Sequence, residues 1–354
     1  MSLTLAPNGA PQILGLNVAI LGATGAVGIE FLRVLESRKF PVAELRLLAS
    51  ERSAGKHLEF QGAQIPVLAV GPDSFEGIDV AFFSAGAARS REYSRHALRA
   101  GAYVIDNSSA FRMDKNVPLI VPEINLHAAK PSDRLISVPN CSAIILLIAV
   151  APLRKLGQIE RIIVSTYQSA SGGGAGMMRR LVEETRAYLE DRDVTQKAPH
   201  PPYAFNLFSH NTEINAEGQN EEEAKVIAES RKILEAPELR MNVTCIRVPV
   251  LRAHSQSITV EFAGKAPDEA AVRAALVQAP GVRVVDDRSA NDFPTPLMAS
   301  GQDDVLVGRI RKDPSHPSAI SMFVAGDQLL KGAALNAVQI AECVVPKARA
   351  SRES

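Results

Sequence analysis

Residues 17–39 read NVAILGATGAVGIEFLRVLESRK, and this stretch decides the fold of the first part of the chain. It opens on a short apolar run, NVAILGA, which is typical of a strand buried on both faces. Three glycines at the spacing GxxGxxG follow. In the last twelve letters apolar residues alternate with charged ones in a helical pattern. The stretch therefore predicts a strand, a tight glycine turn and a helix.

The same alternation continues along the chain. Apolar runs at 44–50 (ELRLLAS), 78–86 (IDVAFFSAG) and 102–109 (AYVIDNSS) predict further strands, and the Ala/Arg-rich stretch 87–101 predicts a helix between the last two. Strands that alternate with helices form a parallel sheet with helices on its faces. We therefore expect an α/β fold that begins with a Rossmann-like, parallel-sheet domain.

After about residue 155 the strands become longer and richer in β-branched residues. Helical segments lie between them, and the apolar segment 328–345 has helical spacing and is predicted to return to the first domain. This pattern predicts a second, α+β domain on a largely antiparallel sheet. The expected strands are 161–168, 242–250, 255–264 and 319–327, and the expected helices are 176–191 and 220–235.

Length and composition exclude several classes of protein. A chain of 354 residues predicts two domains. Its 39 Lys and Arg balance its 39 Asp and Glu, which excludes a strongly basic nucleic-acid binder and an acidic disordered protein. Three widely spaced cysteines build neither a disulfide framework nor a Cys-rich zinc site, and they favour a reducing compartment.

The location of the protein follows from its N-terminus and its apolar runs. The first charged residue is Glu30, so the start lacks the basic cluster of a secretory signal. Residues 1–16 are rich in Pro, Gly and Asn and are expected to form a loose leader. The longest apolar run, 143–153, is about half the length that spans a bilayer. We expect a soluble, cytoplasmic protein.

The glycine turn predicts a dinucleotide site. Gly22, Gly25 and Gly28 lie between the first strand and its helix. Glycines at such a turn let a pyrophosphate approach the backbone N–H groups at the positive end of the helix. The spacing differs from GxGxxG, and a turn that only connects strand to helix is the alternative.

The end of the second predicted strand favours NADP over NAD. An NAD site usually places Asp or Glu there, to bind the ribose 2′-hydroxyl. Here Ser50, Arg52 and Ser53 surround the position, and a guanidinium pairs well with a 2′-phosphate. Glu51 complicates this interpretation, and the alternative is a solvated loop arginine.

Cys141 lies in VPNCS (138–142), directly before a long apolar run that is predicted to be a buried helix. A thiol at a helix N-terminus is stabilised as thiolate by the dipole and the N–H groups, which also suit an oxyanion. The alternative is an inert core cysteine. For Cys245, inside a strand, and Cys343, inside an apolar helix, packing is the better interpretation.

A thiol nucleophile needs a partner that handles protons. Among seven histidines, His254 lies between two predicted strands and is the candidate, with a surface histidine as the alternative. The remaining six, His210 among them, have no context that favours a role. No HxxH or HExxH pattern occurs, so no metal site is predicted.

Ten short motifs together resemble the aspartate-β-semialdehyde dehydrogenase family. They run in the family's order from about residue 17 to about residue 345, nearly the whole chain. Singly each is a weak signal, whereas the ordered set is highly specific. The motifs are GATGAVG, LASERSAG, DNSSAFR, VPEIN, PNCS, YQSASGGG, EEEAK, RVPVLRAHS, VGRIRKD and GDQLLKGAALN.

The resemblance implies roles for matching residues. Cys141 would be the acyl-thioester nucleophile and Asn140 would shape its oxyanion site. His254 would be the general acid/base, and Gln168 would orient the substrate. The substrate and phosphate ligands would be Arg247 for the carboxylate, Glu222 for the amino group, and Arg112 with Lys225 for the phosphate. The NADP site would be lined by Gly22, Thr24, Gly25, Ala26, Val27, Gly28, Ser50, Arg52, Ser53, Ser171, Gly172 and Gln328.

The resemblance also implies an activity and an assembly. The reaction would be the reversible, NADPH-dependent reductive dephosphorylation of 4-phospho-L-aspartate, in lysine, threonine and methionine biosynthesis. The protein would be a homodimer. We divide it into an NADP-binding domain, residues 1–140 with a returning helix at 327–354, and a catalytic and dimerisation domain, residues 141–326.

Departures from the family pattern leave alternatives open. Ala143 replaces an expected hydroxyl residue, the leader is long, and Gln328-Leu329-Leu330 matches one branch of the family while other motifs match another. A paralogue with another substrate therefore remains an alternative, such as N-acetyl-glutamyl-phosphate reductase or glyceraldehyde-3-phosphate dehydrogenase. A cysteine hydrolase and a non-catalytic dinucleotide-binding protein are the others.

Overall fold

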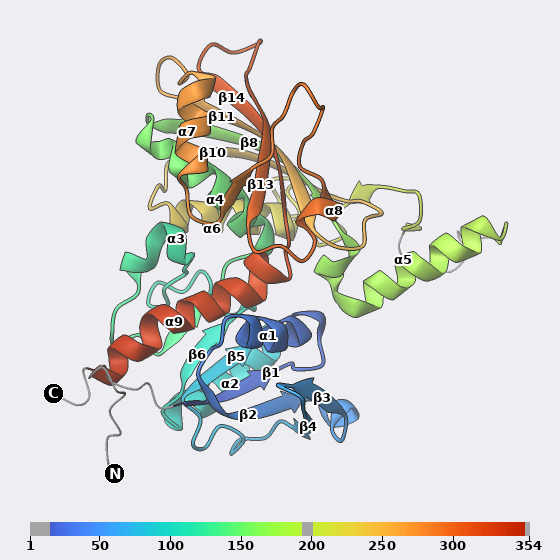
Figure 1. The fold of residues 1–354 in the computed structure, drawn as a ribbon, viewed down its shortest axis with the longest axis vertical. Coiled ribbons are helices and arrows are strands. Elements are labelled where there is room, and N and C mark those ends of the chain that lie inside the picture. Colours follow the sequence, from blue (N-terminus) through green and yellow to red (C-terminus); the bar gives the residue numbers. More distant parts are fainter. Residues whose placement is uncertain (1–14, 193–200, 351–354) are drawn as a thin grey trace. The chain divides into compact units, whose positions relative to one another are not determined.

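The computed structural model describes residues 15–192 and 201–350, with side chains up to residue 345 (Figure 1). The predicted leader falls almost entirely outside the described residues. The chain divides into two compact units. Unit 1 comprises residues 1–118, 127–138 and 337–354, and unit 2 comprises residues 119–126 and 139–336.

Unit 1 contains the predicted parallel sheet. Its strand order is β3-β4-β2-β1-β5-β6-β7, and each pairing is parallel except that of β3 with β4. The strands are β1 (Leu16–Leu21), β2 (Val42–Ala49), β3 (His57–Phe60), β4 (Ala63–Ala69), β5 (Val80–Phe83), β6 (Tyr103–Asp106) and β7 (Leu135–Ser137).

Helices cover both faces of this sheet. On β5, Phe82 stacks on Phe31 of α1 (Ala26–Ser37), while its neighbour Phe83 shares a core cluster with Ala97 of α2 (Ala87–Arg99). Because successive side chains of a strand point to opposite faces, α1 and α2 lie on opposite sides. The helix α9 (Leu335–Ala350) belongs to this unit from Ala337, and its Glu342 pairs with Arg38 at the end of α1.

Unit 2 is built on a second sheet, in the order β12-β13-β14-β11-β8-β10-β9. β11 is antiparallel to both β8 and β14, and β13 to β14, whereas β10 is parallel to β8. The strands are β8 (Ile159–Gln168), β9 (Phe208–Ser209), β10 (Arg240–Arg247), β11 (His254–Phe262), β12 (Val282–Val284), β13 (Val305–Lys312) and β14 (Ala319–Gly326).

One helix forms the centre of unit 2. α4 (Cys141–Val150) is apolar around its whole circumference and buries every residue except Cys141, as such a sequence requires. It packs against β11, β13 and β14, and against α6. The other helices are α3 (Pro122–Asn125), α5 (Gly174–Leu189), α6 (Glu221–Ile233), α7 (Glu269–Val277) and α8 (Pro296–Ala299).

The secondary structure departs from the expectations in places. The elements that were not predicted are the β3–β4 hairpin, β7, β9, β12, β13, α3, α7 and α8. The segment before α9 was expected to be α-helical, but residues Leu330–Ala334 form a π-helical turn. In the described ranges, no helix combines the length and apolar character that crossing a bilayer demands.

Candidate active site

Three predicted site residues form a row across the sheet of unit 2. Arg247, at the end of β10, pairs with Gln168, at the end of β8. In the antiparallel pair of β11 with β8, Ser255 lies opposite Tyr167, which places His254 beside Gln168. Residues in one such row share a face of a sheet. The strand register therefore brings together side chains that are up to 86 positions apart in sequence.

Cys141 is the first residue of α4, and its side chain is partly exposed. Asn140 caps the helix: its Oδ1 accepts the backbone N–H groups of Ser142 at 2.8 Å and of Ala143 at 3.3 Å. Such a cap satisfies the first amides of a helix. Two of the backbone donors that the sequence suggested for an oxyanion are therefore already bound.

Hydrogen bonds join the start of α4 to the strands that carry Gln168 and His254. Ser142 Oγ accepts from Gln168 Nε2 at 2.6 Å, and its carbonyl accepts from Gln256 Nε2 at 2.8 Å. Gln256 lies two residues after His254, on the same face of β11. Behind the nucleophile, Gly332 packs so closely that an added Cβ would lie 2.8 Å from Cys141 Cβ.

Glu222 is buried between two amide groups. Its Oε1 accepts from Asn140 Nδ2 at 2.9 Å and from Gln168 Nε2 at 3.1 Å. Burial opposes ionisation, but His210, these two hydrogen bonds and Arg247 outweigh it and lower the pKa of Glu222. The site therefore holds the ionised carboxylate of Glu222 next to the amide group of Gln168.

Arg247 is held in the row by two acceptors. Its Nη1 donates to the Ser169 carbonyl at 3.2 Å, and its Nη2 lies 2.7 Å from His210 Nε2. A guanidinium only donates, so this nitrogen of His210 accepts. Burial, and after it the charge of Arg247, lowers the pKa of His210 to about 4. The imidazole is therefore neutral at neutral pH.

His254 is fully buried at the start of β11, 1% exposed, rather than in the turn that was expected. Its Nδ1 lies 3.1 Å from the Ser169 backbone N and 3.0 Å from Ser169 Oγ. Burial, followed by the charge of Arg247 and by the charge that His210 gains in acid, holds the pKa of His254 well below its ordinary value.

In unit 1 the glycine turn has the geometry of a phosphate-binding loop. Gly22 takes a φ of +92°, and an added Cβ would lie 2.3 Å from the Ser84 carbonyl. A Cβ on Gly28 would come within 2.3 Å of the Gly22 carbonyl oxygen. Gly25 is exposed at the N-cap of α1, where no side chain caps the described helix and its first turn holds no acidic residue. These residues fit a dinucleotide pyrophosphate.

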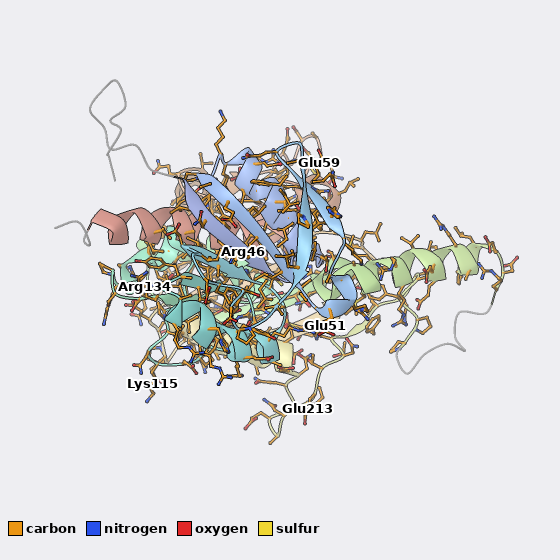
Figure 2. All side chains as sticks on the ribbon, turned by 90° about the horizontal axis from the view of Figure 1, so that it is seen from below. Arg46, Glu51, Glu59, Lys115, Arg134 and Glu213 are labelled. Atoms are coloured by element: carbon orange, nitrogen blue, oxygen red, sulfur yellow. The ribbon has the colours of Figure 1, made fainter. Side chains whose placement is uncertain are left out.

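The turn after β2 fits a ribose phosphate. Ser50 precedes a 3-10 turn, Glu51–Ser53, in which Arg52 is exposed. Glu51 is also exposed there (Figure 2). The guanidinium is thus accessible to a 2′-phosphate.

The two predicted phosphate ligands lie in different units. In unit 1, Arg112 is buried in the loop after β6 and donates from Nη2 to the Asn107 carbonyl at 2.8 Å. In unit 2, Lys225 of α6 pairs with Glu221 at 2.6 Å and is about a quarter exposed.

Comparisons with known proteins decide the family. Residues 150–331 match the profile of the semialdehyde dehydrogenase dimerisation domain, and residues 17–132 match that of the semialdehyde dehydrogenase NAD binding domain. The chain is 52% identical to an aspartate-semialdehyde dehydrogenase of Synechocystis, over 94% of this chain and 98% of the relative.

The chain belongs to the aspartate-semialdehyde dehydrogenase family.

Solved structures of the family agree in fold. The aspartate semialdehyde dehydrogenase II of Vibrio cholerae, complexed with ASA, is 41% identical, with a TM-score of 0.89 over 94% of this chain and 98% of that one. The enzyme of Candida albicans with NADP is 25% identical, with a TM-score of 0.71 over 94% and 99%. The resemblance stated from the ten motifs and the expected two-sheet α/β fold are both confirmed.

Within this member of the family, unit 2 brings six predicted residues into one neighbourhood, where hydrogen bonds link five of them and Cys141 follows Asn140 at the start of α4. Their individual roles stay predictions. Ser171 and Gln328, predicted to line the NADP site, are buried and bonded to each other, while Gly172 is exposed beside His254. The six are Asn140, Cys141, Gln168, Glu222, Arg247 and His254.

Sequence reasoning missed four residues of this neighbourhood. Ser142, Ser169 and His210 bond to predicted residues, and Gln256 bonds to the Ser142 carbonyl. Gln256 could have been found, because it follows His254 at the strand period of two. His210 carried no local signal, since only the pairing of β9 with β10 brings it to Arg247.

Proposed function

We propose that this protein catalyses the reversible, NADP-linked conversion of L-aspartate-4-semialdehyde and phosphate into 4-phospho-L-aspartate. The observation that carries the proposal is the row of Arg247, Gln168 and His254 beneath the start of α4, where Cys141 stands. A relative that is 52% identical over 94% of this chain bears the name of this enzyme. As a family member, the protein is an oxidoreductase.

The charges of the neighbourhood suit an amino-acid substrate. Arg247 offers a guanidinium for an α-carboxylate, and Glu222 offers a carboxylate for the ammonium group. Gln168 lies between them, bonded to Glu222 and Ser142, and is placed to orient the reacting carbonyl. A zwitterion whose side chain ends in a carbonyl would be bound at both charges.

The chemistry is covalent catalysis at Cys141. Its thiolate attacks the acyl phosphate, phosphate leaves toward Arg112 and Lys225, and a thioester remains. His254 acts as the general acid/base at the oxygen of the tetrahedral intermediates. Splitting the reaction in this way replaces one difficult step by two easier ones.

The cofactor assignment rests on unit 1. The pyrophosphate would lie on the turn from Gly22 to Gly28, which includes Thr24, Ala26 and Val27, and Ser50, Arg52 and Ser53 would receive the 2′-phosphate. Ser171, Gly172 and Gln328 of unit 2 complete the proposed set. Bound NADPH supplies the hydride.

The assembly and location extend the proposal. The match of residues 150–331 to a dimerisation domain supports a homodimer. We assign residues 1–140 and 327–354 to NADP binding and residues 141–326 to catalysis and dimerisation. Few, widely spaced cysteines support a cytoplasmic location.

The test is phosphate-dependent NADP reduction with aspartate semialdehyde, run beside the same assay with NAD. We expect turnover that requires phosphate and favours NADP. Cys141→Ala should lose several orders of magnitude in kcat, because the thioester can no longer form. The matched control is Cys343→Ala in α9, which should keep full activity. Ordinary activity of Cys141→Ala, or a preference for glyceraldehyde-3-phosphate or N-acetylglutamate semialdehyde, would contradict the proposal.

A further inference from the structure

His210 is a buried histidine to which the proposed chemistry gives no role. It follows the short strand β9, and its backbone N–H donates to the Cys245 carbonyl of β10 at 2.9 Å. Cys245 and Arg247 point to the same face of β10, so the ring of His210 meets the Arg247 side chain diagonally across the strand pair. The ring is only 7% exposed, and the contact is therefore shielded from bulk solvent.

The hydrogen bonds of His210 are those of a neutral ring. Arg247 Nη2 donates to Nε2 at 2.7 Å, so Nε2 carries no proton. The one proton of the neutral ring then lies on Nδ1, which donates to Thr212 Oγ1 at 3.3 Å. Burial, and after it the charge of Arg247, lowers the pKa of the ring to about 4, although Glu222 acts in the opposite direction. At neutral pH His210 is thus an uncharged acceptor.

Arg247 is oriented by two uncharged groups. Its Nη1 donates to the Ser169 carbonyl at 3.2 Å, and its Nη2 donates to His210. A carboxylate in either place would hold the guanidinium but would also offset its charge, because opposite charges at hydrogen-bond distance attract strongly. The two neutral acceptors fix the side chain and leave its positive charge for an anion.

The remaining N–H groups of Arg247 suit a carboxylate. Two of its five are engaged, and Nε is buried and bonds to no residue in the described ranges. Buried donors are normally paired, so a bound acceptor would complete this nitrogen. A Cβ on the exposed Gly172 would lie 2.9 Å from Arg247 Nη1, so the glycine leaves this part of the guanidinium uncovered. A carboxylate binds two parallel N–H groups of such a fork.

We infer that His210 is a positioning residue for substrate selectivity: it fixes the Arg247 guanidinium in the orientation that binds an α-carboxylate, without competing for its charge. The inference rests on the proposed function and adds a residue to that site. His210 acts through Arg247. Its loss should therefore weaken recognition of the carboxylate far more than it slows the reaction at the aldehyde carbon.

The first test compares two amides at position 210. The side-chain oxygen of His210→Gln can take the place of Nε2, whereas His210→Asn is one carbon shorter and replaces only Nδ1. His210→Asn should raise the KM for aspartate semialdehyde by about tenfold or more, because Arg247 loses a hydrogen bond to a charged group. Its kcat should stay within about threefold of the wild-type value. His210→Gln should keep a KM close to that of the wild type.

His57→Gln, a change of an exposed histidine on β3, is the matched control and should alter neither constant. Urea unfolding of each variant establishes that it is folded under the assay conditions. A folded His210→Asn with the wild-type KM would overturn the inference. If His210→Asn does not fold, a folded His210→Gln whose KM is raised tenfold would overturn it as well.

The second test removes the carboxylate from the substrate. 3-Aminopropanal has the aldehyde and the ammonium group of aspartate semialdehyde but lacks its α-carboxylate. The wild type should favour aspartate semialdehyde in kcat/KM, and His210→Asn should reduce that preference by about tenfold or more, since only the carboxylate depends on Arg247. A residue needed for folding alone would lower both kcat/KM values equally. An unchanged preference in His210→Asn would therefore overturn the inference.

The inference and the proposed function fail in different ways. A wild-type protein that ignores aspartate semialdehyde, or that does not prefer it to 3-aminopropanal, would overturn the proposed function. A wild-type protein with that preference, and a folded His210→Asn that retains it in full, would overturn only the role of His210.

Discussion

At the scale of single residues, His210 shows how burial and one arginine set a protonation state. Its pKa is about 4 in the folded protein, against an ordinary value of 6.5, because the ring is buried beside Arg247. At a pH between these two values, His210 is protonated in the unfolded chain and unprotonated in the folded protein. This contribution to stability is fully present above pH 6.5 and is lost as the pH falls toward 4.

We therefore predict that His210→Gln loses less stability than the wild type between pH 6.5 and pH 4. The glutamine oxygen can still accept from Arg247 Nη2, but it does not titrate. Urea unfolding at steps of half a pH unit measures the difference. His254 also has a lowered pKa and contributes to the slope of both proteins, so the difference between the two slopes is the quantity compared. Equal slopes for the two proteins would contradict the prediction.

Site residues could be predicted where the neighbouring sequence indicated their structural context, and could not where only tertiary contacts bring them to the site. Cys141 was identified because it directly precedes an apolar run that predicts a buried helix. The helix α4 does begin at that residue. Cys245 was assigned to packing, and burial does raise the pKa of its thiol to about 12. Ser169 gave no such signal, because its importance arises only when β8 and β11 lie side by side.

At the scale of elements, the π-helical turn Leu330–Ala334 is pinned by a buried ion pair. Lys331 is 1% exposed, and its Nζ lies 2.7 Å and 2.6 Å from the two carboxylate oxygens of Glu123 in α3. The same Nζ donates to Asn336 Oδ1 at 3.2 Å. Gly332, the next residue, packs on Cys141, so this turn forms the wall behind the nucleophile. Such π-turns are frequent at functional sites.

Lys331→Met should destabilise the protein by about 3–5 kcal/mol, the usual cost of leaving one charge of a buried pair without its counter-charge. It should also lower kcat, because the turn that packs against Cys141 loses the ion pair that holds it in place. Urea unfolding and steady-state assays measure the two effects. The matched control is the double variant Lys331→Met with Glu123→Leu, which should regain most of the stability. A single variant as stable as the wild type would refute this account.

Strands and helices with a strong apolar periodicity could be predicted from the sequence. Elements with unusual backbone geometry or a weak apolar pattern could not. The strands at β1, β5 and β8 and the helix α6 lie where alternation placed them. The π-turn was missed because its bonds, such as Gly332 N to the Asp327 carbonyl, span five residues in an apolar stretch that also suits an α-helix. The β3–β4 hairpin was missed because most of its residues are exposed, which leaves no clear apolar pattern.

At the scale of the whole molecule, NADPH should stabilise the folded chain. A ligand that binds only the folded state at 100 times its Kd adds about 2.7 kcal/mol to the free energy of unfolding. NADH at the same concentration should add less, because Arg52 gains no phosphate partner. Urea unfolding with each nucleotide measures this, and Arg52→Ala should remove the difference. Equal stabilisation by NADH and NADPH in the wild type would contradict the assignment of Arg52.

The division into two units has a consequence for protein engineering. The chain passes between the units four times, after Pro118, Leu126, Val138 and Asn336. A gene fragment that ends near residue 140 would carry Glu123 without Lys331, its partner 208 positions later. Chimaeras that aim to graft another nucleotide-binding half onto this scaffold must consequently exchange three separate segments together, and leave 119–126 with the recipient.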